Sequence, residues 1–309
     1  MTKKKIIILC SLVVLLCLAV VYFLFPGAMF HVAIKAERAI AGLEQRHIDV
    51  KGIRIEYLEG GQGDYLVLLH GFGANKDNWL RIGKHLTPHF RVIAPDLPGF
   101  GESGLNPDGD YSMTAQARFV KAFVQTLGIK SFHLGGSSMG GYISGAYASI
   151  HPQSLKSLLL IAPGGVVSAQ TSEMHQMLKD GKPNPLVARN VPEYEYLLDF
   201  VFVKRPFIPP PIKKFLVQEA IAHQTLNSKI FEQILNARDR TPLEEMLKGL
   251  PIKTLVVWGV QDRVLHVSGA KIIEAVMPKA KLEVMDAIGH LPMIESPEKT
   301  AELYLRFLS

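Results

Sequence analysis

The chain has 309 residues, which is enough for one large domain or two small ones. Its net charge of +6 does not indicate a nucleic-acid partner, because the basic residues are spread along the chain beyond Lys3, Lys4 and Lys5. Both cysteines, Cys10 and Cys17, lie in an apolar amino-terminal segment, so the rest of the chain can form neither a disulfide framework nor a cysteine zinc site.

This amino-terminal segment is long and apolar enough to cross a membrane. Residues 6–25 carry no charge, and 20 residues at about 1.5 Å each make a helix of about 30 Å, the thickness of the hydrocarbon core. We therefore expect residues 1–30 to form a retained single-pass anchor. A cleaved signal peptide, with secretion of the body, is the alternative, although signal peptides usually have a shorter apolar core. The preceding lysines predict a cytoplasmic amino terminus and a body on the opposite side, whether periplasmic, lumenal or extracellular.

From about residue 45, strand patterns alternate with helix patterns. This order predicts an α/β fold whose mostly parallel central sheet has helices on both faces. The predicted strands span residues 53–57, 65–69, 91–94, 131–135, 155–161, 254–257 and 281–285. The predicted helices span residues 79–86, 114–127, 141–148 and 268–277, with a last helix from Pro297. We expect these elements to form one core in two parts, residues 45–163 and 251–309.

The alternation breaks between the two parts, over residues 164–250. Eight of the 19 prolines fall there, among amphipathic pieces such as residues 193–203 and 212–222. Helices broken by proline and inserted between sheet strands predict a helical cap over the carboxyl edge of the sheet, where ligands of open α/β sheets bind. An ordinary packing insertion is the alternative.

A nucleophile motif lies between a predicted strand and a predicted helix. The segment is Gly136-Ser137-Ser138-Met139-Gly140, which has the pattern G-x-S-x-G. In this context Ser138 is expected at a sharp turn with positive φ, and Gly136 and Gly140 leave the room that such a turn requires. A glycine- and serine-rich loop without chemistry is the alternative interpretation.

A serine hydroxyl needs a base and a group that orients the base. In this arrangement the partners follow the serine in the order acid, then histidine, each after a strand. Asp262 follows the strand at residues 254–257, and His290 follows the strand at 281–285. We expect His290 to take the proton of Ser138 and Asp262 to fix the tautomer of His290. Asp286 is the main competing acid.

The oxyanion formed in such a reaction needs hydrogen-bond donors. We expect the backbone N–H groups of Met139 and Phe72 to supply them, and these two residues also to contact the substrate. His70 is predicted to be a hydrogen-bonding support rather than a base, and Asp96 to be a loop-forming residue. The sequence indicates no metal and no organic cofactor.

Together these motifs resemble the α/β-hydrolase superfamily, over nearly everything after residue 45. The segments that carry the resemblance are His70-Gly71-Phe72-Gly73, Asp96-Leu97-Pro98-Gly99-Phe100-Gly101-Glu102-Ser103, Gly136-Ser137-Ser138-Met139-Gly140-Gly141, Trp258-Gly259 with Asp262, and Gly289-His290. The chain is most similar to membrane-anchored monoacylglycerol lipases and related bacterial lipases, on its apolar amino terminus and residues 261–270. His266 departs from the pattern, because many members carry proline there.

The resemblance implies a serine carboxylic-ester hydrolase that acts on lipid esters, such as monoacylglycerol or other acylglycerols, through an acyl-enzyme. A serine at the turn argues against dehalogenases and epoxide hydrolases of this fold, which use aspartate there. Carbon–carbon bond hydrolases of ring-cleavage diketones, peptidases and thioesterases stay open, as does a binding module without catalysis. The expected partners are the lipid ester and the bilayer, which would face cap residues Lys204, Arg205, Lys213 and Lys214.

Overall fold

The computed structural model of the chain describes residues 3–5, 7–8, 10–11, 24–106, 108–236 and 241–309. Most of the apolar span at residues 6–25 lies outside these residues, so the anchor expected at residues 1–30 stays a prediction. Among the helices that are described, none combines the length and the hydropathy needed to cross a membrane.

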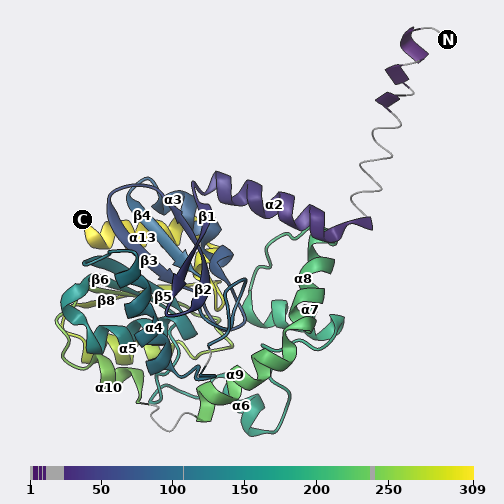
Figure 1. Cartoon of the computed structure of the whole chain (residues 1–309). Coiled ribbons are helices and arrows are strands. Elements are labelled where there is room, and N and C mark those ends of the chain that lie inside the picture. The colour runs from purple at the N-terminus through teal and green to yellow at the C-terminus, as the bar shows by residue number, and fades with distance from the viewer. Residues whose placement is uncertain (1–2, 6, 9, 12–23, 107, 237–240) are drawn as a thin grey trace.

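An eight-stranded sheet runs through the middle of the molecule (Figure 1). Its strands are β1 (Glu44–Val50), β2 (Ile53–Gly60), β3 (Asp64–Leu69), β4 (Phe90–Pro95), β5 (Phe132–Ser137), β6 (Leu155–Ile161), β7 (Thr254–Gly259) and β8 (Ala280–Met285). Their order across the sheet is β1-β2-β4-β3-β5-β6-β7-β8. Strand β2 is antiparallel to β1 and β4, whereas every other neighbouring pair is parallel. The predicted α/β fold with a mostly parallel sheet is confirmed.

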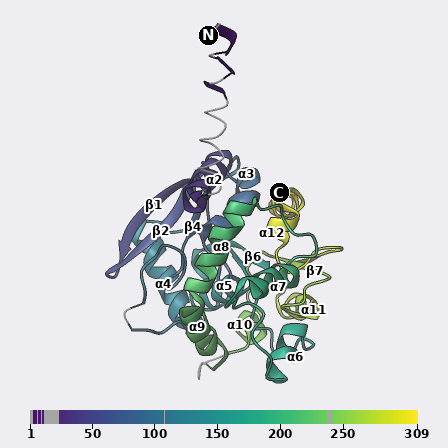
Figure 2. The same cartoon turned by 90° about the vertical axis from the view of Figure 1, so that its right-hand side faces the viewer.

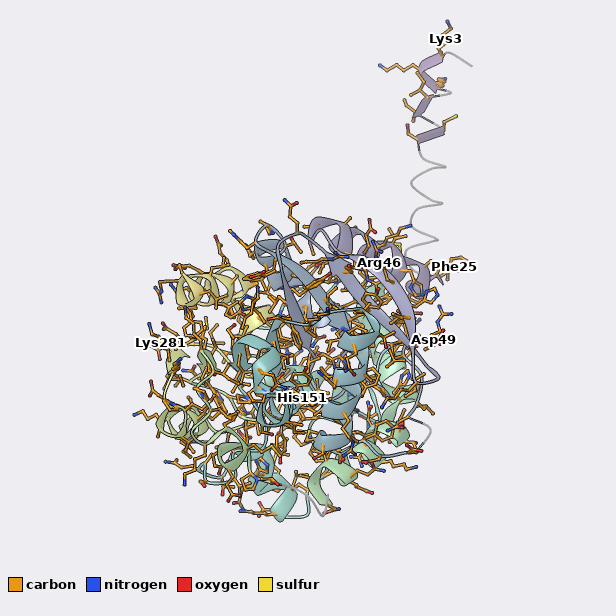
Figure 3. The ribbon with its side chains drawn as sticks, turned by 60° about the vertical axis from the view of Figure 1, so that its left-hand side comes forward. Lys3, Phe25, Arg46, Asp49, His151 and Lys281 are labelled. Carbon is orange, nitrogen blue, oxygen red and sulfur yellow. The ribbon has the colours of Figure 1, made fainter. Side chains whose placement is uncertain are left out.

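Strands β1 and β8 form the two edges of the sheet. Figure 3 shows Arg46 and Asp49 of β1 on one side of the molecule and Lys281 of β8 on the other. Charged side chains on edge strands discourage pairing with a further chain.

The connections between the strands are mostly helical. In chain order the helical elements are α2 (Pro26–Ile40), η1 (Lys76–Trp79), α3 (Leu80–Leu86), α4 (Met113–Thr126), α5 (Met139–Ile150), η2 (Pro152–Ser154), α6 (Glu173–Lys179), α7 (Val191–Val201), α8 (Pro210–Ala222), α9 (Gln224–Asn236), α10 (Leu243–Leu247), α11 (Ser268–Val276), α12 (Pro292–Glu295) and α13 (Pro297–Leu308). Each helix predicted for the core is present, with ends shifted by a few residues.

Both faces of the sheet are buried. Successive residues of a strand point to opposite faces, so one strand contributes to an apolar cluster on each side. In β3, Val67 and Leu69 join an apolar cluster with α4, α5, α10 and α11. Leu66 and Leu68 of the same strand join a second cluster with α3, α12 and α13. All six residues of β5 and all six of β7 are buried. Parallel strands buried on both faces appear in the sequence as short continuous apolar runs, which is how they could be predicted.

Between β6 and β7, helices α6 to α9 build a helical layer beside the sheet, toward the right of Figure 1 and toward the viewer in Figure 2. Helices α6, α7, α8 and α9 share an apolar cluster of their own, which includes Met174, Tyr194, Val217 and Phe231. The short helix α10 contributes Leu243 to the cluster of the sheet instead. We call α6 to α9 the cap helices; the expected domain boundaries stay predictions.

Prolines lie in the first turn of two cap helices, so the expectation that proline breaks these helices is wrong. Helix α7 has Pro192 in its first turn, and α8 begins at Pro210. The first N–H groups of a helix have no intrahelical acceptor, so proline costs no hydrogen bond there. The start of α7 is also capped, because the Asn190 side chain accepts the Glu193 N–H at 2.9 Å.

The sequence patterns do not indicate two elements near the amino terminus. Strand β1 is largely exposed and polar, and it exists because its backbone pairs with β2, with Ile48 opposite Ile55. Helix α2 packs against cap helix α8, where the rings of Phe30 and Phe215 stack with 4.5 Å between their centroids. Both elements depend on partners elsewhere in the fold, which local periodicity does not show.

Candidate active site

Ser138 occupies a strained turn between β5 and α5. Its backbone has φ 54° and ψ −116°, so the predicted positive φ is confirmed. A non-glycine residue in this region costs about 1 to 3 kcal/mol, which the surrounding structure must offset. The Ser138 N–H donates to the Ile161 carbonyl at 2.9 Å, and the Ser138 carbonyl accepts the N–H groups of Gly164 and Tyr142 at 2.9 and 3.1 Å. The end of β6 and the start of α5 therefore hold the serine in this conformation.

Two glycines let the backbone pass through this turn. A side chain on Gly136 would come within 2.1 Å of the Gly140 carbonyl oxygen, and one on Gly140 within 2.1 Å of the Leu69 carbonyl oxygen. Both clashes are with backbone atoms, which cannot move aside as a flexible side chain can. The predicted need for small residues on both sides of Ser138 is confirmed.

His290 and Asp262 come together from the loops after β8 and β7. Their side chains are buried, and His290 Nδ1 lies 2.8 Å from Asp262 Oδ2. Oδ2 also accepts the indole N–H of Trp258 at 3.0 Å, and Oδ1 accepts the N–H groups of Val264 and Leu265 at 2.8 and 2.9 Å. Because an ionised carboxylate only accepts hydrogen bonds, Nδ1 of His290 carries a hydrogen and Nε2 is left as the acceptor of the neutral ring.

One cavity brings the predicted nucleophile and base to a common surface. Ser138 and His290 both line it, as does Phe72. Asp262 is buried behind the imidazole, at the Nδ1 side. Asp286, the competing acid, is exposed. The carboxylate bonded to His290 is thus the one predicted from the order of the strands.

The loop after β3 is held beside the serine by a buried imidazole. His70 Nε2 accepts the Leu97 N–H at 3.0 Å, so Nδ1 carries the hydrogen and donates to the Gly71 carbonyl at 2.7 Å. Burial lowers the pKa of His70, which keeps the ring neutral in this role. Because the peptide bond is trans, the Phe72 N–H points away from the Gly71 carbonyl and from His70. A side chain on Gly71 would lie 3.3 Å from Ser138 Cβ, so the loop passes directly beside the serine.

Phe72 follows Gly71 in this loop and Met139 follows Ser138 in the chain, and their roles as oxyanion donors stay predictions. Met139 begins the 12-residue helix α5, and the N–H groups of a first helical turn have no acceptor within the helix. The Phe72 ring packs edge-on against Phe231 of α9, with centroids 5.1 Å apart. The predicted supporting role of His70 is confirmed, and this loop also contacts the cap helices.

A buried ion pair lies where the same loop ends at η1. The sequence does not indicate this pair. Lys76 Nζ lies 2.8 Å from Asp96 Oδ2 and 2.6 Å from Glu102 Oε2, and the Lys76 and Asp96 side chains are 1% and 0% exposed. Burial by itself would lower the pKa of Lys76, but the two carboxylates outweigh it and the pKa is raised. Asp96 also accepts the backbone N–H groups of Lys76 and Glu102, so its predicted loop-forming role is confirmed. Lysine is normally solvated, so its type alone gives no sign of burial.

Comparison with known proteins agrees with this geometry. A family profile described as alpha/beta hydrolase fold matches residues 64–196. Lipase 1 of Psychrobacter immobilis is 37% identical over 284 residues, which cover 89% of this chain and 87% of that protein. The chain belongs to the α/β-hydrolase family. Monoacylglycerol lipase ABHD6 of Mus musculus is 30% identical to the hydrolase over 299 residues, covering 93% of this chain and 89% of that protein.

A solved structure is also similar to this chain over nearly its whole length. A crystal structure described as a membrane phospholipase A superimposes on the hydrolase with a TM-score of 0.89 and 40% identity, over 99% of this chain and 98% of that one. The predicted similarity to monoacylglycerol lipases and bacterial lipases is confirmed. The hydrolase is a serine hydrolase of the carboxylesterase and lipase type.

The cavity of the hydrolase has a volume of about 1540 Å³, larger than the roughly 300 to 1,000 Å³ of most small-molecule sites. One wall is apolar and comes mainly from the cap, with Leu186, Tyr194, Leu198, Val201, Ile208 and Leu216. Another wall is polar and comes from α2, η1, β1 and β4, with Lys35, Arg38, Gln45, Arg46, Asp77 and Arg91. The cavity therefore offers different surroundings to the two ends of an amphiphilic molecule.

The departure at His266 has a local explanation. His266 Nδ1 accepts the Ser268 N–H at 3.2 Å, at the first residue of α11. The imidazole thus satisfies an N–H group that has no acceptor within the helix. Within the part of the chain that the structure describes, no three His, Cys, Asp or Glu side chains are grouped to hold a metal ion.

Proposed function

We propose that the hydrolase cleaves the ester bond of acylglycerols through an acyl-enzyme formed on Ser138. The observation that carries this proposal is the 2.8 Å hydrogen bond between His290 Nδ1 and Asp262 Oδ2. This bond leaves Nε2 as the base of an imidazole that shares a cavity with Ser138.

In the acylation step, Ser138 Oγ attacks the ester carbonyl carbon while His290 Nε2 takes the hydroxyl proton. The carbonyl oxygen becomes an oxyanion, which accepts the N–H groups of Met139 and Phe72. Asp262 stabilises the imidazolium that has formed. The carbon–oxygen bond to the glycerol then breaks, and the leaving oxygen takes the proton from His290 Nε2.

Deacylation repeats these roles with water as the nucleophile. His290 Nε2 takes a proton from the water as its oxygen attacks the acyl carbon of the ester on Ser138. The second oxyanion uses the same donors, Met139 and Phe72. When this intermediate collapses, Ser138 Oγ leaves with the proton held by His290, and a fatty acid is released.

The walls of the cavity support an amphiphilic substrate. The acyl chain would lie along the apolar cap wall, where burial contributes about 0.8 kcal/mol for each CH₂ group. The glycerol and any head group would lie against the polar wall that includes Arg38 and Asp77. Because one solved relative is described as a membrane phospholipase A, glycerophospholipids belong with monoacylglycerols in the substrate panel.

We further propose that the enzyme works at a membrane, with residues 6–25 as its anchor and the body on the side opposite the cytoplasm. Exposed apolar side chains support the contact, since Phe25, at the start of α2, is 56% exposed and Phe207, before α8, is 82% exposed (Figure 3 labels Phe25). Protease digestion of sealed vesicles tests the topology, because a cytoplasmic body would be cut only when the cytoplasmic face is open to the protease.

Replacement of the nucleophile tests the chemistry. Ser138→Ala should abolish hydrolysis of p-nitrophenyl butyrate and labelling by a fluorophosphonate, with no change in the far-UV circular dichroism. Ser137→Ala is the matched control, because Ser137 Oγ is buried without a hydrogen-bond partner among the described residues and lies one position away. Turnover by Ser138→Ala at the rate of the Ser137→Ala control would refute the proposal.

A substrate panel then separates the lipid esters from other substrates of this fold. Release of fatty acid from 1-oleoylglycerol and from a phosphatidylglycerol vesicle is compared with cleavage of a ring-cleavage diketone. We expect both lipid esters to be hydrolysed faster than the diketone. Faster cleavage of the diketone would instead favour a carbon–carbon bond hydrolase.

A further inference from the structure

Glu295 connects the loop of the proposed base to the cap. It is the last residue of α12 and lies five positions after His290 in the chain. Its Oε1 accepts the Gly289 N–H at 2.8 Å, and its Oε2 accepts the N–H groups of Val203 and Lys204, both at 3.0 Å. All three donors are backbone groups, and hydrogen bonds to a carboxylate are stronger than those between neutral groups.

A second contact joins the same two segments directly. The His290 N–H donates to the carbonyl of Val201, the last residue of α7, at 2.9 Å. The segments also touch closely, because a side chain on Gly289 would lie 2.7 Å from the Val201 oxygen and 3.0 Å from Glu295 Oε1. One hydrogen bond therefore joins residues 289–290 to residues 201–204 directly, and three more connect them through the Glu295 carboxylate.

The cap segment in this contact also belongs to the substrate cavity. Tyr194, Leu198 and Val201 of α7 line the cavity that Ser138 lines. The end of the same helix reaches the loop of the proposed acid, since Arg263 Nη1 donates to the Asp199 carbonyl at 3.1 Å. One cap helix thus contacts the loops of both residues that are to activate the serine, as well as the space for the substrate.

We propose that Glu295 is a positioning residue that sets the place of His290 Nε2 through the backbone of its loop. Asp262 holds the imidazole only at Nδ1, and the ring can still shift if the backbone at Gly289 and His290 moves. A misplacement of about 1 Å can cost about 100-fold in rate. The Glu295 carboxylate fixes this backbone against Val203 and Lys204. The position of His290 Nε2, and with it the rate of proton transfer, therefore depends on where the end of α7 lies.

This inference rests on the proposed function, because it takes His290 as the base. The test uses two variants of the full chain, Glu295→Ala and Glu295→Gln. Alanine removes all three acceptor contacts. Glutamine keeps the shape of the side chain but turns an NH₂ group toward either the Gly289 N–H or the two cap N–H groups. It serves as the second variant if alanine does not fold.

The matched control is Glu244→Ala in α10. The Glu244 carboxylate also accepts three hydrogen bonds, from the N–H groups of Val167 and Ser168 and from the Ser168 hydroxyl. None of these partners belongs to the loops of His290 or Asp262. Both alanine substitutions should therefore lower the stability of the fold by a similar amount. Only Glu295→Ala should also displace His290.

The quantities to be measured are the Tm of each variant, its kcat and KM for p-nitrophenyl butyrate, and its rate of labelling by a fluorophosphonate. Glu295→Ala should lower kcat and the labelling rate together by about 10- to 100-fold, with KM within about two-fold of wild type and a smaller loss for Glu295→Gln. Glu244→Ala should lower Tm by a similar amount and leave kcat within about two-fold of wild type. The inference is overturned if both Glu295 variants keep the wild-type kcat, or if Glu244→Ala loses as much kcat as Glu295→Ala. A wild-type enzyme that is not labelled would instead overturn the proposed function.

Discussion

Asp262→Asn gives a sharp test of the acid, because the structure determines how an amide must sit in its place. The Oδ1 position faces two backbone donors, the N–H groups of Val264 and Leu265. The amide oxygen must occupy this position, since neither backbone donor can become an acceptor. The amide NH₂ then occupies the Oδ2 position, opposite the indole N–H of Trp258 and Nδ1 of His290.

This arrangement forces the imidazole into the other tautomer. His290 Nδ1 must accept from the NH₂ group, so the hydrogen moves to Nε2, which can then no longer take the proton of Ser138. The expected loss in kcat is about 10⁴-fold, equivalent to about 5.5 kcal/mol of transition-state stabilisation. The Trp258 N–H also loses its acceptor at Oδ2, although it keeps the Leu265 carbonyl at 3.1 Å. Folding should therefore persist.

The assay is kcat for p-nitrophenyl butyrate at pH 8, with circular dichroism to check folding. Asp286→Asn is the matched control, because it makes the same change at the competing acid, which is exposed. It should keep the wild-type kcat within about two-fold. If Asp262→Asn loses less than about 10-fold, or if Asp286→Asn loses as much as Asp262→Asn, the reasoning about the tautomer is wrong.

Three further predictions concern stability. Gly140→Ala should destabilise the fold by about 3 kcal/mol in urea unfolding, because the added methyl group would meet the Leu69 carbonyl oxygen at 2.1 Å; a cost below about 1 kcal/mol would contradict this. Lys76→Met should lower the free energy of unfolding by about 3 kcal/mol, because it leaves the Asp96 carboxylate buried without its cation. The double variant with Asp96→Asn should recover part of that loss. A double variant no more stable than Lys76→Met would argue against the ion pair. Burial lowers the pKa of His70, so the unfolded state binds more protons, and stability should fall as the pH drops below about 6.5 toward the lowered folded pKa. His70→Gln should make the Tm less dependent on pH between 7 and 5 than it is in the wild type, and an unchanged dependence would show that His70 does not contribute to it.

Local patterns in the sequence are sufficient to predict the serine turn and the strands β2 to β8 of the sheet. Strand β7 is a short, mostly apolar run between chain breakers, and burial on both faces explains why such a run becomes a parallel strand inside the sheet. The turn at Ser138 can be predicted because its steric requirement acts on Gly136 and Gly140, two positions away on either side. The order of the strands also predicts that Asp262 and His290 meet, since the carboxyl ends of neighbouring parallel strands lie at one edge of a sheet.

Contacts between distant segments decide the rest of the site, and side-chain patterns give little sign of them. Lys76 can be buried because two carboxylates, 20 and 26 positions away in the chain, accept hydrogen bonds from its Nζ. Strand β1 exists because its backbone pairs with β2, although its own residues are mostly polar and exposed. The partners of Glu295 include a backbone N–H group 92 positions away. Every residue except proline carries such a group, so the identity of the side chains at residues 203, 204 and 289 cannot reveal the contact, and only the folded chain brings it about.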